Sequence, residues 1–187
     1  AGHVVLHTSG VRGREALVPL SASGAALGSI HPLQTFADAQ GDPGALVGTP
    51  AVVEGSPEAV RVARGLAEAL GMAPILELSA ERKPLYHAAA VFSSNYVVTL
   101  VAMSERLARE AGAGDASGRL FHALLANTVR NLAHDDPATA LTGPIRRGDV
   151  GTVAAHLLAL SGSDRMLYVA LAREALRLAR TSGLEES

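Results

Sequence analysis

Hydrophobic positions in the N-terminal part of the chain come in short runs separated by turn residues. These runs predict four strands, at 4–6, 25–31, 51–54 and 74–78. A short amphipathic helix is expected over 13–20, and a mobile loop over 38–48, where Gly, Asp and Pro dominate. Ser56 and Pro57 are typical of an N-cap and a first helical position, and the helix they begin is expected to end near Leu70. Alternating strands and helices indicate a parallel or mixed sheet with helices on its faces.

After Lys83 the apolar positions follow a helical period. Pro84 is expected to begin a helix that extends to about Glu110 and is about 40 Å long at the α-helical rise. Further helices are expected at 117–133, 150–160 and 164–180, the last two capped by Asp149 and Ser163. The predicted fold class is therefore α/β followed by all-α, with a sheet domain at 1–81 and a helical domain at 82–187.

Composition narrows the classes of function. The chain has 187 residues, and its 48% of hydrophobic side chains is enough for a packed core. A net charge of −2 and 3% aromatic residues argue against a nucleic-acid partner, which requires clustered Lys and Arg. Cysteine is absent, which excludes disulfides and thiolate chemistry and fits a cytoplasmic protein. Lysine occurs once, at Lys83, which we interpret as a compositional preference for arginine.

Metal, export and membrane signals are weak in this sequence. The histidines are scattered and no HExxH motif occurs, so no metal site is predicted. The N-terminus has neither the basic nor the long apolar region of a signal peptide. The segment 85–103 is apolar enough to resemble a membrane span, but His87, Asn95 and Thr99 interrupt it. A helix buried inside a protein or a dimer core is the interpretation we favour, and no membrane partner is expected.

Candidate ligand-binding residues follow the first two predicted strands: His7, Ser9, Gly10, His31, Pro32 and Gln34. Ligands of open α/β sheets bind outside the carboxyl ends of the strands, so these residues are expected at one sheet edge. His31 is a candidate to polarise or protonate a substrate carbonyl. An ordinary strand-to-helix turn, and a histidine paired with nearby backbone, would explain the same residues without a function.

A second set of polar residues lies on the predicted long helix. The helical repeat places His87, Val91 and Asn95 on one side, with Ser94 within about 20° of His87. His87 and Asn95 would be about 12 Å apart along the axis, so they are expected to contact two ends of a groove rather than one atom. The alternative is a set of polar side chains paired inside a helix interface.

A basic loop precedes the helix predicted at 150–160. It contains Thr142, Arg146 and Arg147 and leads into a helix N-terminus at Asp149. Backbone amides, the helix dipole and two guanidinium groups together are able to bind a carboxylate or a phosphate. Two exposed arginines beside an ordinary N-cap are the alternative.

In order along the chain, the motifs HTSG, GSIHPLQTF, AVVEG, LYHAAAVFSSNY and ALTGPIRRGD resemble one bacterial family over nearly the whole sequence. Its members are NADP-binding oxidoreductases that join a Rossmann-like domain to a helical domain of unknown function. The helical part is similar to the C-terminal domains of 6-phosphogluconate dehydrogenase, ketopantoate reductase and pyrroline-carboxylate reductase. The HP step is more weakly similar to that of prephenate dehydrogenases. The resemblance implies a cleft between the two domains and a homodimer formed through the helical domain.

Two departures from the pattern of this family bear on its chemistry. Asn95 matches the asparagine that 6-phosphogluconate-type dehydrogenases carry on their interdomain helix, but their lysine four residues earlier is replaced by Val91. His87 is the expected substitute. No GxGxxG turn occurs, and the first strand resembles the fifth strand of a Rossmann sheet, so about 80 residues are expected to precede it. This chain is therefore expected to bind NADP weakly.

Two functions remain open at this point. The resemblance implies an NADP-dependent reductase or dehydrogenase of a small carbonyl, imine or hydroxy-acid substrate. The expected catalytic residues are His87, Asn95 and His31, with cofactor contacts at His7, Ser9, Gly10, His31 and Pro32 and substrate contacts at Gln34, Ser94, Thr142, Arg146 and Arg147. The alternative is a non-catalytic module for nucleotide sensing or dimerisation, which the missing glycine turn favours.

Overall fold

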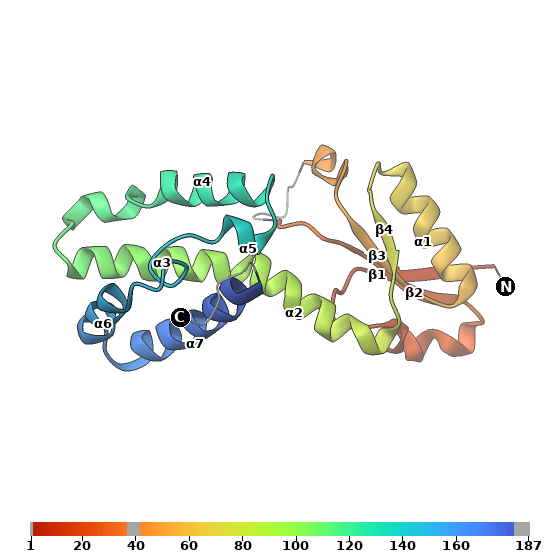
Figure 1. Cartoon of the computed structure of the whole chain (residues 1–187). Coiled ribbons are helices and arrows are strands. Elements are labelled where there is room, and N and C mark those ends of the chain that lie inside the picture. The colour runs from red at the N-terminus through yellow and green to blue at the C-terminus, as the bar shows by residue number, and fades with distance from the viewer. Residues whose placement is uncertain (1, 37–41, 182–187) are drawn as a thin grey trace. The chain divides into compact units, whose positions relative to one another are not determined.

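The chain folds into a mixed sheet followed by helices. The structure, a computed structural model, describes residues 2–36 and 42–181. The sheet has the order β1 (Val4–His7), β2 (Ala26–Pro32), β3 (Ala51–Gly55) and β4 (Ile75–Glu77) (Figure 1). β1 and β2 are parallel, β2 and β3 antiparallel, and β3 and β4 parallel. The predicted strands and the α/β-then-α fold class are confirmed.

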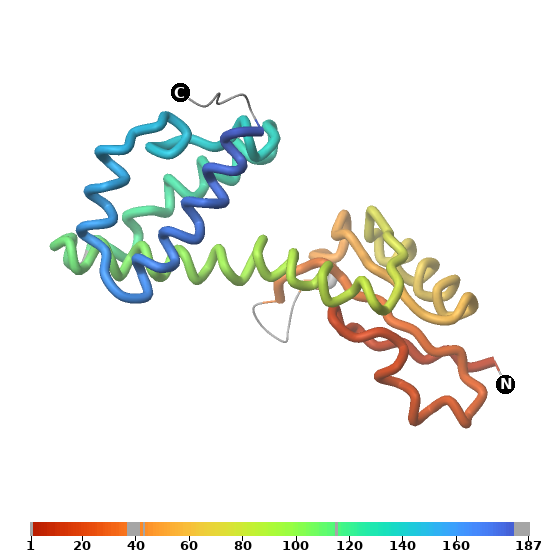
Figure 2. Tube along the Cα trace, turned by 60° about the horizontal axis from the view of Figure 1, so that its bottom comes forward, coloured from red at the N-terminus to blue at the C-terminus, as the bar shows by residue number. Residues whose placement is uncertain are grey.

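Helix α1 (Pro57–Ala69) covers one face of this sheet (Figures 1 and 2). It begins as the sequence predicts, because the Ser56 side chain accepts a hydrogen bond from the amide of Ala59. Its apolar face packs on β2 and β3 to form the core: Ile30, Ala51, Val53, Val60, Ala63, Ala67 and Met72. The helix ends as predicted near Leu70, which is its C-cap and is 40% exposed. The core therefore belongs to the sheet and this one helix.

Two short segments differ from their predicted structure. The expected amphipathic helix at 13–20 is a 3-10 helix, η1 (Arg14–Ser23), with Pro19 inside it. Proline lacks the amide hydrogen that an α-helix needs, so the tighter and less regular helix forms. In the predicted mobile loop 38–48, residues 37–41 lie outside the described residues, and η2 (Pro43–Leu46) is a 3-10 helix.

The long helix predicted from Pro84 to Glu110 is two helices. α2 (Lys83–Ser93) follows the 3-10 helix η3 (Ala80–Arg82), and α3 (Asn95–Glu110) follows Ser94, whose φ of −129° and ψ of −74° break the helix. The hydroxyl of Ser93 donates to the carbonyl of Ala89 at 3.1 Å, a side-chain bond that competes with the helical ladder. The single uninterrupted helix that the sequence predicts is therefore wrong, and the interruption lies between His87 and Asn95.

The C-terminal part is helical throughout. Its elements are η4 (Gly114–Arg119), α4 (His122–Leu132), α5 (Pro137–Ala140), α6 (Val150–Ala159) and α7 (Gly162–Thr181). The predicted helix 117–133 is thus shorter, and α5 was not expected. Asp149 caps α6 by accepting from the amide of Thr152, as predicted, whereas Ser163 lies inside α7 rather than at its cap.

The chain divides into two compact units, 1–103 and 104–187, so α2 and the first part of α3 belong with the sheet. The domain boundary after residue 81 stays a prediction. Within the second unit, Arg106 on α3 bonds Asp164 on α7 at 2.7 Å. The segment 80–110 is long and apolar enough to cross a membrane by length and composition, and none of its most apolar window is buried. Burial of this helix inside the chain is therefore not observed.

Candidate functional site

A pocket of about 410 Å³ opens where β2 ends and α2 passes beside it. Residues from two segments, 31–35 and 86–95, line it. Five of them are candidates from the sequence: His31, Gln34, His87, Ser94 and Asn95. Tyr86, next to His87, also lines it. No acidic, lysine or arginine side chain is among the residues that line it. The pocket therefore presents neutral hydrogen-bonding groups and imidazoles at a strand end, where ligands of α/β sheets bind.

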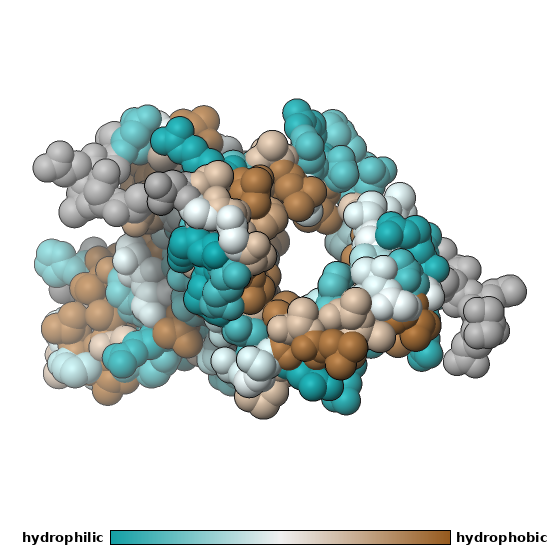
Figure 3. Space-filling model, turned by 90° about the vertical axis from the view of Figure 1, so that its left-hand side faces the viewer, coloured by the Kyte–Doolittle hydropathy of each residue, from teal (hydrophilic) through white to brown (hydrophobic). Residues whose placement is uncertain are grey.

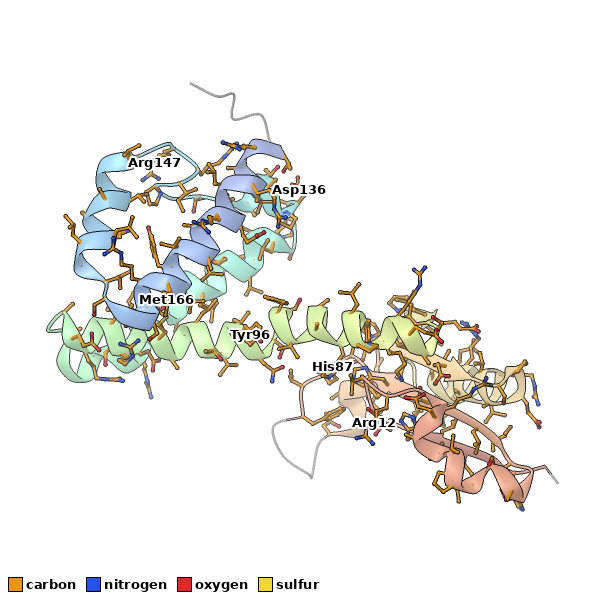
Figure 4. The ribbon with its side chains drawn as sticks, turned by 90° about the horizontal axis from the view of Figure 1, so that it is seen from below. Arg12, His87, Tyr96, Asp136, Arg147 and Met166 are labelled. Carbon is orange, nitrogen blue, oxygen red and sulfur yellow. The ribbon has the colours of Figure 1, made fainter. Side chains whose placement is uncertain are left out.

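Three titratable rings meet at one side of the pocket. Nδ1 of His31 is hydrogen-bonded to the hydroxyl of Tyr86 at 3.1 Å, with the rings edge to face at 84°. The ring of His87, which projects from α2 (Figure 4), lies 6.0 Å from that of His31 between centroids. Among the described residues His87 has no hydrogen-bond partner. Of the two imidazoles, His87 is therefore the one with neither nitrogen paired in the described part of the chain.

Gly10 is buried against these two histidines. A Cβ at this position would lie 2.5 Å from Cδ2 of His87 and 2.7 Å from Nε2 of His31. Real Cβ atoms do not approach other heavy atoms so closely, so only glycine allows the turn after β1 to touch both rings. The expectation that Gly10 belongs to the site is consistent with this contact, although the contact is with the protein's own side chains.

Burial shifts the pKa values of the Tyr86–His31 pair in opposite directions. It lowers the pKa of the His31 imidazole, and the charges of His87 and Lys83 lower it further. It raises the pKa of the Tyr86 phenol. Near pH 7 both groups are therefore uncharged, and the pair shares its hydrogen bond without a net charge.

Acid is expected to destabilise the fold through His31. Because the folded-state pKa lies below the unfolded value, the neutral ring contributes its full stability above about pH 6.5, and that contribution is lost as the pH falls through the folded pKa. The variant His31→Gln should therefore lose less stability than the wild type between pH 7.5 and pH 5. Urea denaturation at both pH values measures this difference. His134→Gln, at an exposed position, is the control; an equal effect there would contradict the assignment.

The sequence analysis missed Lys83. This only lysine of the chain is completely buried, and its Nζ donates to the carbonyl of Ser9 at 2.9 Å and to Oγ of Ser29 at 2.7 Å. Ser29 Oγ is in turn 3.5 Å from Oε2 of the buried Glu54, which accepts from the amide of Arg14 at 2.7 Å. The one signal in the sequence is a lone lysine in an arginine-rich chain, at the end of the strand region, which a compositional preference for arginine explains equally well.

Two of the expected cofactor contacts serve the turn itself. Nδ1 of His7 accepts from the amide of Ser9 at 3.1 Å, and Nε2 is paired with the carbonyl of Gly13 at 2.8 Å. The hydroxyl of Ser9 accepts from the amide of Arg12. Pro32 ends β2 beside the pocket but is not among its lining residues. His7 and Ser9 thus shape the loop that presents Gly10.

The basic loop lies in the second compact unit. Nη1 of Arg146 donates to the carbonyl of Ala179 at 3.4 Å, and the carboxylate of Asp149 is occupied by Thr152. Pro144, Ile145 and Gly148 line a pocket of about 330 Å³ with apolar side chains of α6 and α7. The structure therefore does not bring Thr142, Arg146 and Arg147 together with the strand-end residues within one compact unit.

The fold and the strand-end pocket define an α/β protein with a helical C-terminal region. Residues 49–175 match the family DUF2520, a domain of unknown function, and the chain belongs to this family. No curated protein matches the sequence. Among solved structures, protein TM1727 from Thermotoga maritima has a TM-score of 0.81 and 24% identity over 97% of this chain and 71% of that one. The putative NADP oxidoreductase BF3122 from Bacteroides fragilis has a TM-score of 0.76 and 22% identity over 93% of this chain and 65% of that one. These likenesses show a shared fold.

Proposed function

We propose that the protein is an NADP-dependent oxidoreductase of a small carbonyl, imine or hydroxy-acid substrate, which binds in the strand-end pocket. The observation that carries this proposal is the convergence of His31, Tyr86 and His87 on one pocket at the carboxyl end of β2. Titratable groups with shifted pKa values in a pocket are typical of acid–base chemistry. The name of the Bacteroides fragilis protein supports the same class of reaction.

The described residues fit one end of NADP. The pocket offers the amide of Asn95, the hydroxyl of Ser94 and apolar α2 side chains, which suit a nicotinamide ring and its carboxamide. They do not fit the pyrophosphate, because no basic side chain lines the pocket and the sequence has no GxGxxG turn. NADP, when bound, supplies or accepts a hydride.

The residues of the chain would orient the substrate and move its proton. His87, whose nitrogens have no partner among the described residues, is placed to donate a proton to the substrate oxygen or nitrogen during reduction. Asn95 would anchor the substrate through its amide, and the Tyr86–His31 pair would hold one wall of the pocket in a neutral state. His31 therefore supports the site rather than reacting directly.

Replacement of His87 or Asn95 with alanine should weaken ligand binding while leaving the fold intact. Nicotinamide mononucleotide is the probe, because it carries the ring without the pyrophosphate. In NMR titrations each variant should bind it at least about tenfold more weakly than the wild type, a loss of about 1.4 kcal/mol. Asn95 is exposed and His87 is half-buried, and neither belongs to the buried core, so the unfolding midpoint should change little.

His134→Ala and Asn131→Ala are the matched controls, since both positions are exposed on the second unit. They should bind the probe like the wild type. Retained binding in His87→Ala and Asn95→Ala, together with early unfolding, would show that the two residues are structural. A pocket that binds the probe but supports no NADPH oxidation with any small 2-oxo acid would instead favour the nucleotide-sensing module.

Intact NADP should bind this chain only in the millimolar range. The sequence has no GxGxxG turn, and no lysine or arginine lines the pocket among the described residues, so the pyrophosphate should lack most of its usual binding energy. Isothermal titration calorimetry measures the constant directly. A low-micromolar dissociation constant would contradict this prediction and the interpretation of the pocket's lining.

We also propose that the helical region forms a homodimer. In the second unit, the described residues that are buried are Ala108, Ser117, Ala138 and Ala179, so no side chain larger than alanine's forms an apolar core there. Large apolar side chains are exposed instead; Val150 on α6 is 77% exposed and Leu158 86%. Figure 3 faces the side on which these helices lie in Figure 1 and shows hydrophobic surface in brown. Exposed apolar area on this scale is typical of an interface.

A further inference from the structure

Lys83 lies where three parts of the first unit meet: the start of α2, the turn after β1 and the strand β2. It is the first residue of α2, and its Nζ donates to the carbonyl of Ser9, in the turn after β1, and to Oγ of Ser29, in β2. Both acceptors are close, at 2.9 and 2.7 Å, and the lysine side chain is fully buried. A charged donor held in this way fixes its acceptors more firmly than a neutral one.

The carbonyl that Lys83 holds belongs to the peptide bond between Ser9 and Gly10. A peptide unit is planar, so fixing its oxygen also fixes the position of the next Cα. That next Cα is Gly10, which lies so close to the rings of His31 and His87 that a Cβ would overlap both. The lysine ammonium therefore determines, through one peptide plane, how Gly10 lies against the two imidazoles of the pocket.

The charges around this arrangement are limited and identifiable. Burial lowers the pKa of Lys83, whereas Glu54 on β3 and Glu15 on η1 raise it. Around His31 the facing groups are His87 and Tyr86 on α2 and Lys83 itself. Glu15 accepts from the amide of Gly13, and Glu54 from that of Arg14, so both carboxylates bind backbone amides at the start of η1, directly after the loop that carries Gly10.

We propose that Lys83 is the positioning residue of the pocket: its ammonium ties the Ser9–Gly10 peptide to Ser29 and thereby holds Gly10 against His31 and His87. It does not touch the pocket, since it is absent from the residues that line it. The role concerns the geometry of the two imidazoles, so it stands whether or not the pocket catalyses oxidoreduction.

Stability alone does not distinguish this role from an ordinary structural one, because removing a buried charged donor leaves its partners unpaired and destabilises a protein in either case. The test therefore follows the histidine rings. In the wild type, NMR should show nuclear Overhauser contacts from the Gly10 Hα atoms to Hδ2 of His87 and Hε1 of His31. In Lys83→Met these contacts should be lost, and the His31 titration midpoint should move upward because the lysine charge no longer opposes protonation. Arg82→Met removes an exposed neighbouring cation and should change neither.

A chemical rescue separates the ammonium from the rest of the side chain. The chain contains no cysteine, so Lys83→Cys carries a single thiol that can be aminoethylated in denaturant, giving a near-isosteric ammonium. After refolding, the modified protein should regain the Gly10–histidine contacts and the wild-type His31 midpoint. Carboxamidomethylated Lys83→Cys, which is similar in length but neutral, should not.

A measurement on the wild type keeps the proposal testable if the variants fail to fold. Uniform ¹³C labelling of lysine gives one Cε resonance, because Lys83 is the only lysine. At pH 7 this resonance should report an ammonium. A neutral amine at pH 7 would overturn the proposal, as would a Lys83→Met protein that keeps both the ring contacts and the His31 midpoint. Failure of the aminoethylated protein to recover them, while folded, would overturn it as well.

Discussion

Replacing Gly28 with alanine is expected to lower the free energy of unfolding by about 2–4 kcal/mol. Gly28 is in β2 and is paired with Gly55 of β3. A Cβ at Gly28 would lie 2.6 Å from the carbonyl oxygen of Glu54 and 2.9 Å from Cβ of Ala59, the latter in α1. The Glu54 carbonyl and the Ala59 methyl group cannot rotate away from the added Cβ, so α1 would have to shift away from the sheet. Urea denaturation of the purified variant measures the loss.

Gly65→Ala is the matched control for this substitution. Gly65 is in the same helix-and-sheet layer, within α1, and a Cβ there would meet no atom within 4 Å. Alanine restricts the unfolded chain and favours the helix, so this variant should gain about 0.5–1 kcal/mol. Equal effects of the two substitutions would contradict the close approach of α1 to β2.

The purified protein should scatter light as a particle of about twice its chain mass of 19.1 kDa. The expectation rests on the helical unit, where Leu158 and Val150 of α6 are exposed and, among its described residues, alanine is the largest buried apolar side chain. Leu158→Glu would place a charge on this surface and should raise the dimer dissociation constant at least about tenfold. Light scattering over a dilution series measures both quantities.

Leu66→Glu is the control for the dimer, since Leu66 is a 44% exposed leucine of α1 in the other unit. It should leave the mass unchanged. A mass near 19.1 kDa at every concentration would refute the homodimer. A dimer that Leu66→Glu weakens and Leu158→Glu does not would place the interface outside the helical unit.

Short-range sequence patterns predicted the secondary structure correctly where a single rule, such as alternation or capping, decided it. The strand runs, the cap at Ser56 and the cap at Asp149 are as expected, because alternation, turn residues and capping chemistry act over a few neighbouring residues. The same reasoning was wrong at Ser94, where three consecutive poor helix formers interrupt an apolar helical pattern. At 13–20 it predicted a helix, which is present, but not its 3-10 type, which Pro19 favours.

The residues of the candidate site were also predicted from the sequence in part. His31, Gln34, His87, Ser94 and Asn95 were selected from the sequence, and all of them line one pocket. Their selection depended on strand-end position and helical spacing, and the spacing argument assumed an uninterrupted helix, whereas the structure interrupts it at Ser94. The anion-binding role of Arg146 and Arg147 and the homodimer stay predictions.

By itself, the sequence determined the four strands and α1, the strand end that carries His31, and the absence of thiol chemistry, because these depend on composition and short-range pattern. Only the tertiary structure decided which polar groups pair. It brought Tyr86 onto His31 across 55 positions and Lys83 onto Ser9 across 74. It also buries Lys83, the single lysine, which the sequence alone assigns to a preference for arginine. Contacts between residues so distant along the chain are set by how α2 packs on the sheet, which no local pattern encodes.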